Sequence, residues 1–287
     1  MSGTWGSMRV AMSRRSLPTS STRCEPGSWA DRPYAHPAMH WIIFIPIAFL
    51  SGSIPFGYLI GKVNGIDIRE HGSGNIGATN LGRVLGRRYF FACFYLDMLK
   101  GLLPTVVAGY FMGTLGTLEV VGSDAYWWMG VMICAVLGHM FTPWLGFKGG
   151  KGVATGLGAL LGIFPAMTIP ASGALLVYLM VMFLWRYVSL ASCSAAASLP
   201  LWVWIVFAQY RTFQIRQMST RTDWDRLPAE QIELLKTDIP NYGIPFFVVS
   251  IAVALLVINK HRSNLGRINR GEEPRIGEPR TEPSTEG

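Results

Sequence analysis

The chain has 287 residues, of which 50% are hydrophobic and only 15% are charged, whereas soluble domains usually carry about 25% charged residues. Its formal charge of +8 would suit a nucleic-acid partner, but the positive residues form short clusters beside apolar runs, which is typical of the cytoplasmic ends of membrane segments. The composition therefore favours an integral membrane protein and argues against nucleic acid as a partner.

The first 38 residues are polar, basic and rich in proline and serine, and they lack the apolar stretch of a signal peptide. We expect residues 1–38 to be a disordered extension, or the start to have been assigned upstream of a natural first residue at Met39. Residues 277–287 have a similar polar composition and are expected to be a disordered tail.

Apolar runs of membrane-spanning length follow. Four runs without Asp, Glu, Lys or Arg are close to the ~20 residues that cross a bilayer, namely 41–61, 125–147, 187–210 and 239–259. A helix from about residue 88 to 113 would be a fifth span, with Asp97 and Lys100 spaced to pair with each other.

The uncharged stretch 152–185 is too long for one span at about 1.5 Å per residue. Pro165 and Pro170 indicate a turn in its middle, so we expect two shorter helices there. The sequence thus predicts an all-α integral membrane protein with about seven transmembrane helices over residues 39–276.

With the N-terminus outside, seven spans put four polar stretches on one face of the membrane. These are "GSGNIGATN" (72–80), "GFKGGKGVATG" (146–156), "RYVSLAS" (186–192) and "NKHRSNLGR" (259–267). Lysine and arginine concentrate on that face, which the positive-inside tendency assigns to the cytoplasm. Loop 211–242 lies on the other face, and its "DRLPAEQIELLK" predicts a short amphipathic helix.

The two glycine-rich stretches indicate anion-binding loops, although neither is a dinucleotide or Walker motif in its context. Glycines let backbone N–H groups approach an anion, and Lys148, Lys151 and Arg83 add positive charge. The alternative is that glycines only permit tight reversals between helices. Similarly, His261 and Asn264 share a helix face by their spacing, or belong to a basic helix end that faces lipid headgroups. His139 is interpreted as a hydrogen-bonded core histidine or a ligand.

The four cysteines, Cys24, Cys93, Cys134 and Cys193, show neither CxxC nor metal-ligand spacing. Neither a disulfide framework nor a metal site is predicted.

In order, the motifs "SGSIPFGYLIGK", "GSGNIGATN", "LDMLKG", "GHMFTPWLGFKGGKGVAT", "RYVSLAS" and "KHRSNLGRI" resemble the acyl-phosphate-dependent glycerol-3-phosphate acyltransferase family of bacterial membranes. The resemblance runs from about Met39 to Ile276. It implies seven helices in the plasma (inner) membrane with the active site on the cytoplasmic face. It also implies transfer of a fatty acyl group from acyl phosphate to the 1-hydroxyl of glycerol 3-phosphate, which gives lysophosphatidic acid and phosphate in the first acylation of phospholipid synthesis. No cofactor or metal takes part, and a hand-off from the enzyme that makes acyl phosphate is expected.

Matched by motif, the resemblance implies four catalytic residues: Ser73, Arg83, His261 and Asn264. The implied substrate-binding residues are Asn75, Lys148, Gly149, Gly150, Lys151 and Ser189, and Glu273 in "RGEEPRIG" is the counterpart of a family glutamate.

Both substrates carry phosphate, so the site needs two neighbouring groups of anion-binding residues. Either His261 or a substrate phosphate oxygen can act as the base. We favour a role for His261 in positioning the substrate, because nothing in the sequence around it is placed to orient an imidazole.

The competing function is a transporter or flippase for a phosphorylated solute or lipid, but such proteins usually place polar groups near the midplane and often show repeats.

Overall fold

The structure of this chain is a computed structural model that describes residues 38–120, 122–221, 227–237 and 239–276. The expected N-terminal extension up to residue 37 and the expected tail 277–287 lie outside the described residues. Within the described ranges every regular element is a helix, and these ranges contain no strand.

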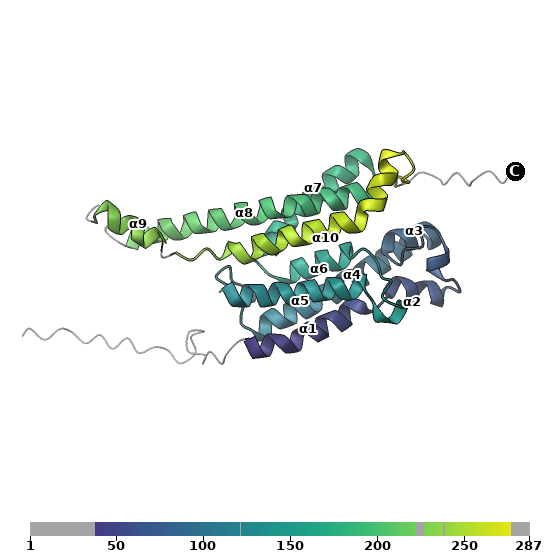
Figure 1. Cartoon of the computed structure of the whole chain (residues 1–287), viewed down its shortest axis with the longest axis horizontal. Helices are drawn as coiled ribbons and strands as arrows, with labels where there is room; N and C mark the ends of the chain where they lie inside the picture. Colours follow the sequence, from purple (N-terminus) through teal and green to yellow (C-terminus); the bar gives the residue numbers. More distant parts are fainter. Residues whose placement is uncertain (1–37, 121, 222–226, 238, 277–287) are drawn as a thin grey trace, which may run out of the picture. The chain divides into compact units, whose positions relative to one another are not determined.

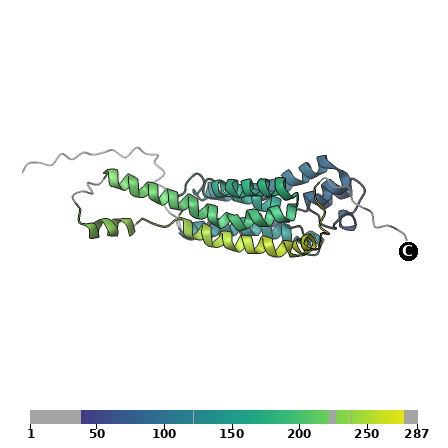
Figure 2. The same ribbon diagram turned by 90° about the horizontal axis from the view of Figure 1, so that it is seen from above.

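The α-helices in chain order are α1 (Ala38–Ser53), α2 (Phe56–Val63), α3 (Ala78–Leu85), α4 (Arg87–Phe111), α5 (Gly122–Met140), α6 (Val153–Gly162), α7 (Thr168–Trp185), α8 (Val188–Arg221), α9 (Ala229–Thr237) and α10 (Gly243–Asn269). Helix α1 packs on α5, α4 packs on α6, and α8 packs on both α7 and α10. The short helices α2 and α3 gather at one end of the long helices, and α9 lies at the other end (Figures 1 and 2).

Six helical segments of the described chain are long and apolar enough to cross a membrane: Trp41–Val63, Arg87–Phe111, Gly122–Leu145, Thr168–Trp185, Val188–Thr220 and Gly243–Asn269. The seventh expected span is α6, whose 10 residues extend only about 15 Å, roughly half of a bilayer's hydrocarbon core. The division of 152–185 into two helices is confirmed, although α6 is too short to cross alone. Pro170 lies in the first turn of α7, where its missing N–H costs no helical hydrogen bond.

Two boundaries differ from the sequence prediction. The first span is not one continuous helix, because it breaks at Ile54 and Pro55, and the ring nitrogen of Pro55 has no hydrogen to donate. Helix α8 continues to Arg221, so the first part of the expected loop 211–242 is helical. The short helix expected in this loop is confirmed as α9.

Hydrogen bonds to Glu119, which precedes α5, hold the extended part of α8. The Tyr210 hydroxyl donates to the Glu119 carboxylate over 2.6 Å, and Gln214 Nε2 donates to the same oxygen over 3.2 Å. Contacts of this kind join residues about 90 positions apart, so the local sequence pattern does not reveal them.

Glycines set the close approach of α6 to α4. A Cβ atom on Gly158 would lie 1.9 Å from the Met98 carbonyl oxygen, and one on Gly162 would lie 2.0 Å from Thr105 Oγ1. Without side chains at these positions the two backbones can pack directly, as small residues allow in membrane helices. The short α6 is therefore held by packing against α4.

The predicted pair of Asp97 and Lys100 is confirmed inside α4. Both side chains are buried, and the Lys100 ammonium lies 2.7 Å from the Asp97 carboxylate. Lys100 also donates to the carbonyl oxygen of Ile54 over 2.7 Å, at the break between α1 and α2. His139 Nδ1 lies 3.7 Å from the same carboxylate, and its ring is buried.

The packing of α6 predicts different outcomes for two glycines on this helix. We expect Gly158→Ala to lower the thermal unfolding midpoint in detergent, because overpacking a close contact costs about 1–3 kcal/mol. Gly156→Ala is the matched control, since its Cβ would meet Val136 Cγ2 at 3.8 Å, an ordinary contact. An unchanged midpoint for Gly158→Ala would contradict the close approach of α6 to α4.

Candidate active site

A buried carboxylate, Glu273, organises the polar end of α8 and α10. One of its oxygens accepts hydrogen bonds from Ser189 Oγ over 2.9 Å and from Asn264 Nδ2 over 2.7 Å. The other accepts from Arg267 Nε over 2.8 Å. Burial raises the pKa of Glu273, but the bonds from Asn264, Ser189 and Arg267 outweigh burial and hold that pKa below its ordinary value of 4.5.

The sequence after α10 explains how Glu273 reaches this position. Gly271 has a φ of +73°, the left-handed conformation that glycine adopts without strain at the end of a helix. Its N–H donates to the Ile268 carbonyl over 3.0 Å, and the Glu272 N–H donates to the Arg267 carbonyl over 2.8 Å. This turn reverses the chain, so that the following glutamate packs back against α8 and α10.

Lys151 joins the same network through an amide. Its ammonium donates to Asn264 Oδ1 over 2.6 Å, so the side chain of Asn264 lies between the Lys151 cation and the Glu273 anion. Burial lowers the pKa of Lys151 to about 8, although the nearby Glu273 carboxylate acts in the opposite direction. An ammonium has three donors, so two remain for a further acceptor.

The loop before Lys151 folds over the end of α5. The N–H groups of Gly149 and Gly150 donate to the carbonyls of Met140 and His139 over 3.2 and 3.1 Å. A Cβ on Gly149 would lie 2.0 Å from the His139 carbonyl oxygen, and one on Gly150 would lie 2.2 Å from the His139 ring. In this structure both N–H groups therefore cap the end of α5, and an anion-binding role for Gly149 and Gly150 stays a prediction.

The N-terminus of α6 lies directly behind this loop. Helix α6 begins at Val153, two residues after Lys151. The first N–H groups of a helix have no intrahelical partner and point back along the axis, which favours an anion at that end. Lys151 and the start of α6 thus form an electropositive corner.

Asn80 organises the first glycine-rich stretch. Its Oδ1 accepts from the Ser73 N–H over 2.8 Å, and its Nδ2 donates to the carbonyls of His71 and Asn75 over 3.0 and 2.9 Å. Asn80 is buried, whereas Ser73 is exposed. This stretch is therefore a structured loop with Ser73 at its surface.

Arg83 connects this loop region to the C-terminal segment. It lies in the last turn of α3, and its Nη2 donates to the Pro274 carbonyl over 3.4 Å. Pro274 directly follows Glu273, so Arg83 lies beside the network.

His261 is held by the helix that carries it. Its side chain is 2% exposed, and Nδ1 lies 2.8 Å from the Val257 carbonyl oxygen, one turn earlier in α10. Because a carbonyl can only accept, Nδ1 carries the hydrogen and Nε2 presents a lone pair. The premise that nothing orients this imidazole is therefore wrong. Asn264, three residues later, is also buried, so the two share one face of α10.

Hydrogen bonds of the described residues bring together Lys151, Asn264 and Ser189, with Arg83 beside them. They do not connect Ser73, Asn75 or Lys148 to the network, and Lys148 is exposed. Sequence reasoning overlooked two residues that the structure places here, Arg267 and Asn80. The signal for Arg267 was its spacing of three residues from Asn264, and Asn80 is the last residue of the first glycine-rich stretch.

Comparisons with known proteins agree on one family. The family model described as glycerol-3-phosphate acyltransferase matches residues 42–271. Glycerol-3-phosphate acyltransferase of Prochlorococcus marinus is 35% identical over 83% of this chain and 99% of its own length, and that of Geotalea daltonii is 38% identical over 81% and 95%. The crystal structure of PlsY, an integral membrane glycerol 3-phosphate acyltransferase, in its glycerol 3-phosphate form has a TM-score of 0.63 at 32% identity, covering 83% of this chain and 96% of that one. Its lysophosphatidic acid form gives a TM-score of 0.62, also at 32% identity, covering 83% and 95%.

The environment of Glu273 predicts a pH-dependent contribution to stability. Because its pKa is lower in the folded chain, ionised Glu273 stabilises the fold above the unfolded value near 4.5, and this contribution is lost as pH falls through the folded pKa. We expect the difference in unfolding midpoint between wild type and Glu273→Gln to be large at neutral pH and to shrink below about pH 4.5. Glu272→Gln is the control, since Glu272 is exposed and pairs with exposed Arg270. A difference that does not change with pH would contradict this assignment.

Proposed function

The chain belongs to the glycerol-3-phosphate acyltransferase family, and we propose that the network of Lys151, Asn264 and Glu273 forms its site for the phosphate of glycerol 3-phosphate. It is an integral membrane enzyme that transfers an acyl group to glycerol 3-phosphate. The observation that carries the proposed site is the Lys151 ammonium, which is anchored through one donor and lies beside the start of α6. This geometry suits a dianionic phosphate.

The acyl donor is proposed to be acyl phosphate. In the reaction the 1-hydroxyl oxygen of glycerol 3-phosphate bonds to the acyl carbon, and the bond from that carbon to the phosphate oxygen breaks. The hydroxyl proton passes to a base, and lysophosphatidic acid and phosphate are the products. The cations Lys151 and Arg83 stabilise the phosphate groups as charge shifts to the leaving group. An enzyme that forms acyl phosphate must supply the donor at the same membrane.

The donor and the reaction are tested together with purified protein. Consumption of acyl phosphate should require glycerol 3-phosphate and should yield equal amounts of lysophosphatidic acid and phosphate. Transfer from acyl-coenzyme A at an equal rate would contradict the donor assignment. A transporter would instead move glycerol 3-phosphate into vesicles without forming an ester.

The site is proposed to face the cytoplasm of the bacterial inner membrane, because lysine and arginine concentrate at this end of the helices. In a variant of the protein without its native cysteines, we expect Ser263→Cys at the exposed end of α10 to be protected from an impermeant thiol reagent added to intact cells. Gln231→Cys on exposed α9 should react. The reverse labelling pattern would place the site outside.

The shifted pKa of Lys151 predicts an alkaline limit for substrate binding. Only the protonated amine binds phosphate well, so we expect the KM for glycerol 3-phosphate to rise as pH increases through about 8. Lys151→Ala should raise this KM roughly ten- to a hundredfold at neutral pH, since a charge-assisted hydrogen bond contributes about 1.5–3 kcal/mol.

Two further variants separate Lys151 from its neighbour. Lys151→Arg stays charged at every working pH and should remove the alkaline rise in KM. Lys148→Ala, which alters an exposed lysine outside the network, should keep that rise. An unchanged alkaline rise in Lys151→Arg would remove Lys151 from phosphate binding.

We propose that His261 positions glycerol 3-phosphate by accepting a hydrogen bond from its 2-hydroxyl at Nε2, and that a substrate phosphate oxygen takes the proton of the attacking 1-hydroxyl. A neutral backbone carbonyl, and not a carboxylate, accepts the Nδ1 hydrogen, so among the described residues no anion is hydrogen-bonded to the ring to stabilise an imidazolium.

Comparing two variants tests this role. His261→Ala should lower kcat about 10²–10⁴-fold. His261→Gln should recover much of the rate, because a carboxamide oxygen can accept the hydrogen bond of the 2-hydroxyl but cannot take a proton at working pH. Both variants must unfold at the wild-type midpoint for the comparison to count. A Gln variant as inactive as the Ala variant would identify His261 as the base.

A further inference from the structure

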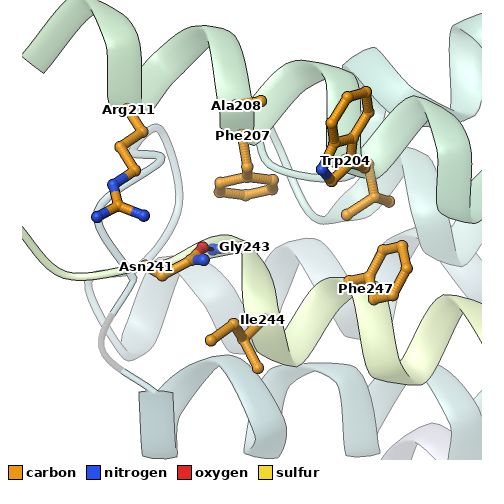
Figure 3. Close-up of a pocket in the computed structure, with 9 residues that line it drawn as sticks. Trp204, Phe207, Ala208, Arg211, Asn241, Gly243, Ile244 and Phe247 are labelled. Atoms are coloured by element: carbon orange, nitrogen blue, oxygen red, sulfur yellow. Dashed lines mark hydrogen bonds between the residues drawn. The ribbon is translucent and has the colours of Figure 1, made fainter.

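A cavity lies between α8 and α10, far from the candidate active site. Its volume is about 240 Å³, and α8 together with the segment at the start of α10 forms its walls (Figure 3). Phe207 on α8 lies about 18 residues from Ser189, which corresponds to roughly 27 Å along a helix. The distance is close to the ~30 Å hydrocarbon thickness of a bilayer, so the cavity lies near the opposite membrane interface.

The walls of this cavity are mostly apolar. Trp204, Ile244 and Phe247 line it and are 61%, 51% and 37% exposed. Phe207 is buried between them and stacks on Phe246 with ring centroids 5.2 Å apart. These exposed side chains at membrane depth form a surface that suits a hydrocarbon chain.

The rim of the cavity is polar and positively charged. Figure 3 shows the Arg211 guanidinium near Asn241, to one side of the aromatic side chains. Arg211 Nε is buried without a hydrogen-bond partner in the described part of the chain, and an Nη donates only to the Lys236 carbonyl over 3.4 Å. A guanidinium has five N–H donors, and buried donors without acceptors are costly. The rim therefore lacks an acceptor that an anion would supply.

We propose that this cavity binds a membrane phospholipid, with the phosphate on Arg211 and one acyl chain along Trp204, Ile244 and Phe247. A soluble anion would use the guanidinium but not the apolar walls. A neutral lipid would cover the apolar walls but would not supply a phosphate acceptor for the Arg211 donors. A phospholipid matches both parts at an interface where its phosphate and chain naturally separate. The site is distinct from the one for acyl transfer and does not depend on that assignment.

The test measures lipid binding to the delipidated full-length protein by native mass spectrometry. The probes are dioleoyl phosphatidylglycerol, which carries a phosphate in its headgroup, and dioleoylglycerol, which has the same acyl chains but no phosphate. Wild type should bind phosphatidylglycerol more tightly than dioleoylglycerol. Arg211→Gln should weaken phosphatidylglycerol binding roughly tenfold or more. Arg216→Gln is the matched control, because Arg216 is exposed on the same helix and should bind like wild type.

A second variant tests the apolar part. Ala208 also lines the cavity, and a phenylalanine side chain at this position would fill it. Ala208→Phe should therefore weaken the binding of both lipids. Retained acyltransferase activity and an unchanged unfolding midpoint establish that each variant is folded. Wild-type affinity for phosphatidylglycerol in Arg211→Gln or in Ala208→Phe would overturn the proposal, as would equal affinity of wild type for the two lipids.

Discussion

The buried carboxylate of Glu273 is the constraint on which the polar end of this protein depends. A buried carboxylate is tolerated only when several donors surround it, and here α8 supplies Ser189 while α10 supplies Asn264 and Arg267. Losing any of these donors would leave the buried Glu273 carboxylate with too few hydrogen bonds. The hydrogen bonds therefore hold α8, α10 and the segment after α10 in fixed positions relative to one another. The position of the carboxylate thus sets where the ends of α8 and α10 meet.

The side-chain amide of Asn264 connects Lys151 to Glu273. A direct ion pair between Lys151 and Glu273 would also hold the lysine in place, but the carboxylate would then occupy the ammonium and offset its charge. With the amide between them, Lys151 keeps two donors that the proposed site would use for a substrate phosphate, yet its position is tied to Glu273. The cost is partial burial, which brings the pKa of Lys151 down to about 8 and makes the site sensitive to alkali.

Much of the fold could be predicted from the sequence because bilayer thickness fixes the length of a span. The helices around 88–113 and 125–147 followed from that constraint, and the division of 152–185 followed from it together with Pro165 and Pro170. The break at Pro55 was not predicted, because Pro46 and Pro104 show that a proline does not always break a helix of this chain. The continuation of α8 to Arg221 was not predicted, because it depends on contacts with the distant Glu119. The residues of the proposed site were recognisable in the sequence as glycine-rich and basic stretches expected on one face. The hydrogen bonds between these residues were not recognisable, because Lys151 and Asn264 lie 113 residues apart in the sequence. The close packing of Gly149 and Gly150 against the end of α5 was equally hidden.

The buried charges of α4 supply the remaining support for the lysine loop. His139 lies under Gly150, which has no side chain to push it away, and the His139 ring faces the Asp97 carboxylate at 3.7 Å. Asp97 is fixed by Lys100, which is itself bonded to the carbonyl of Ile54 at the break of the first span. Contacts therefore run from that break through α4 and α5 to the loop that carries Lys151. An ion pair at membrane depth is costly, and its place in this series of contacts gives the pair of Asp97 and Lys100 a structural role.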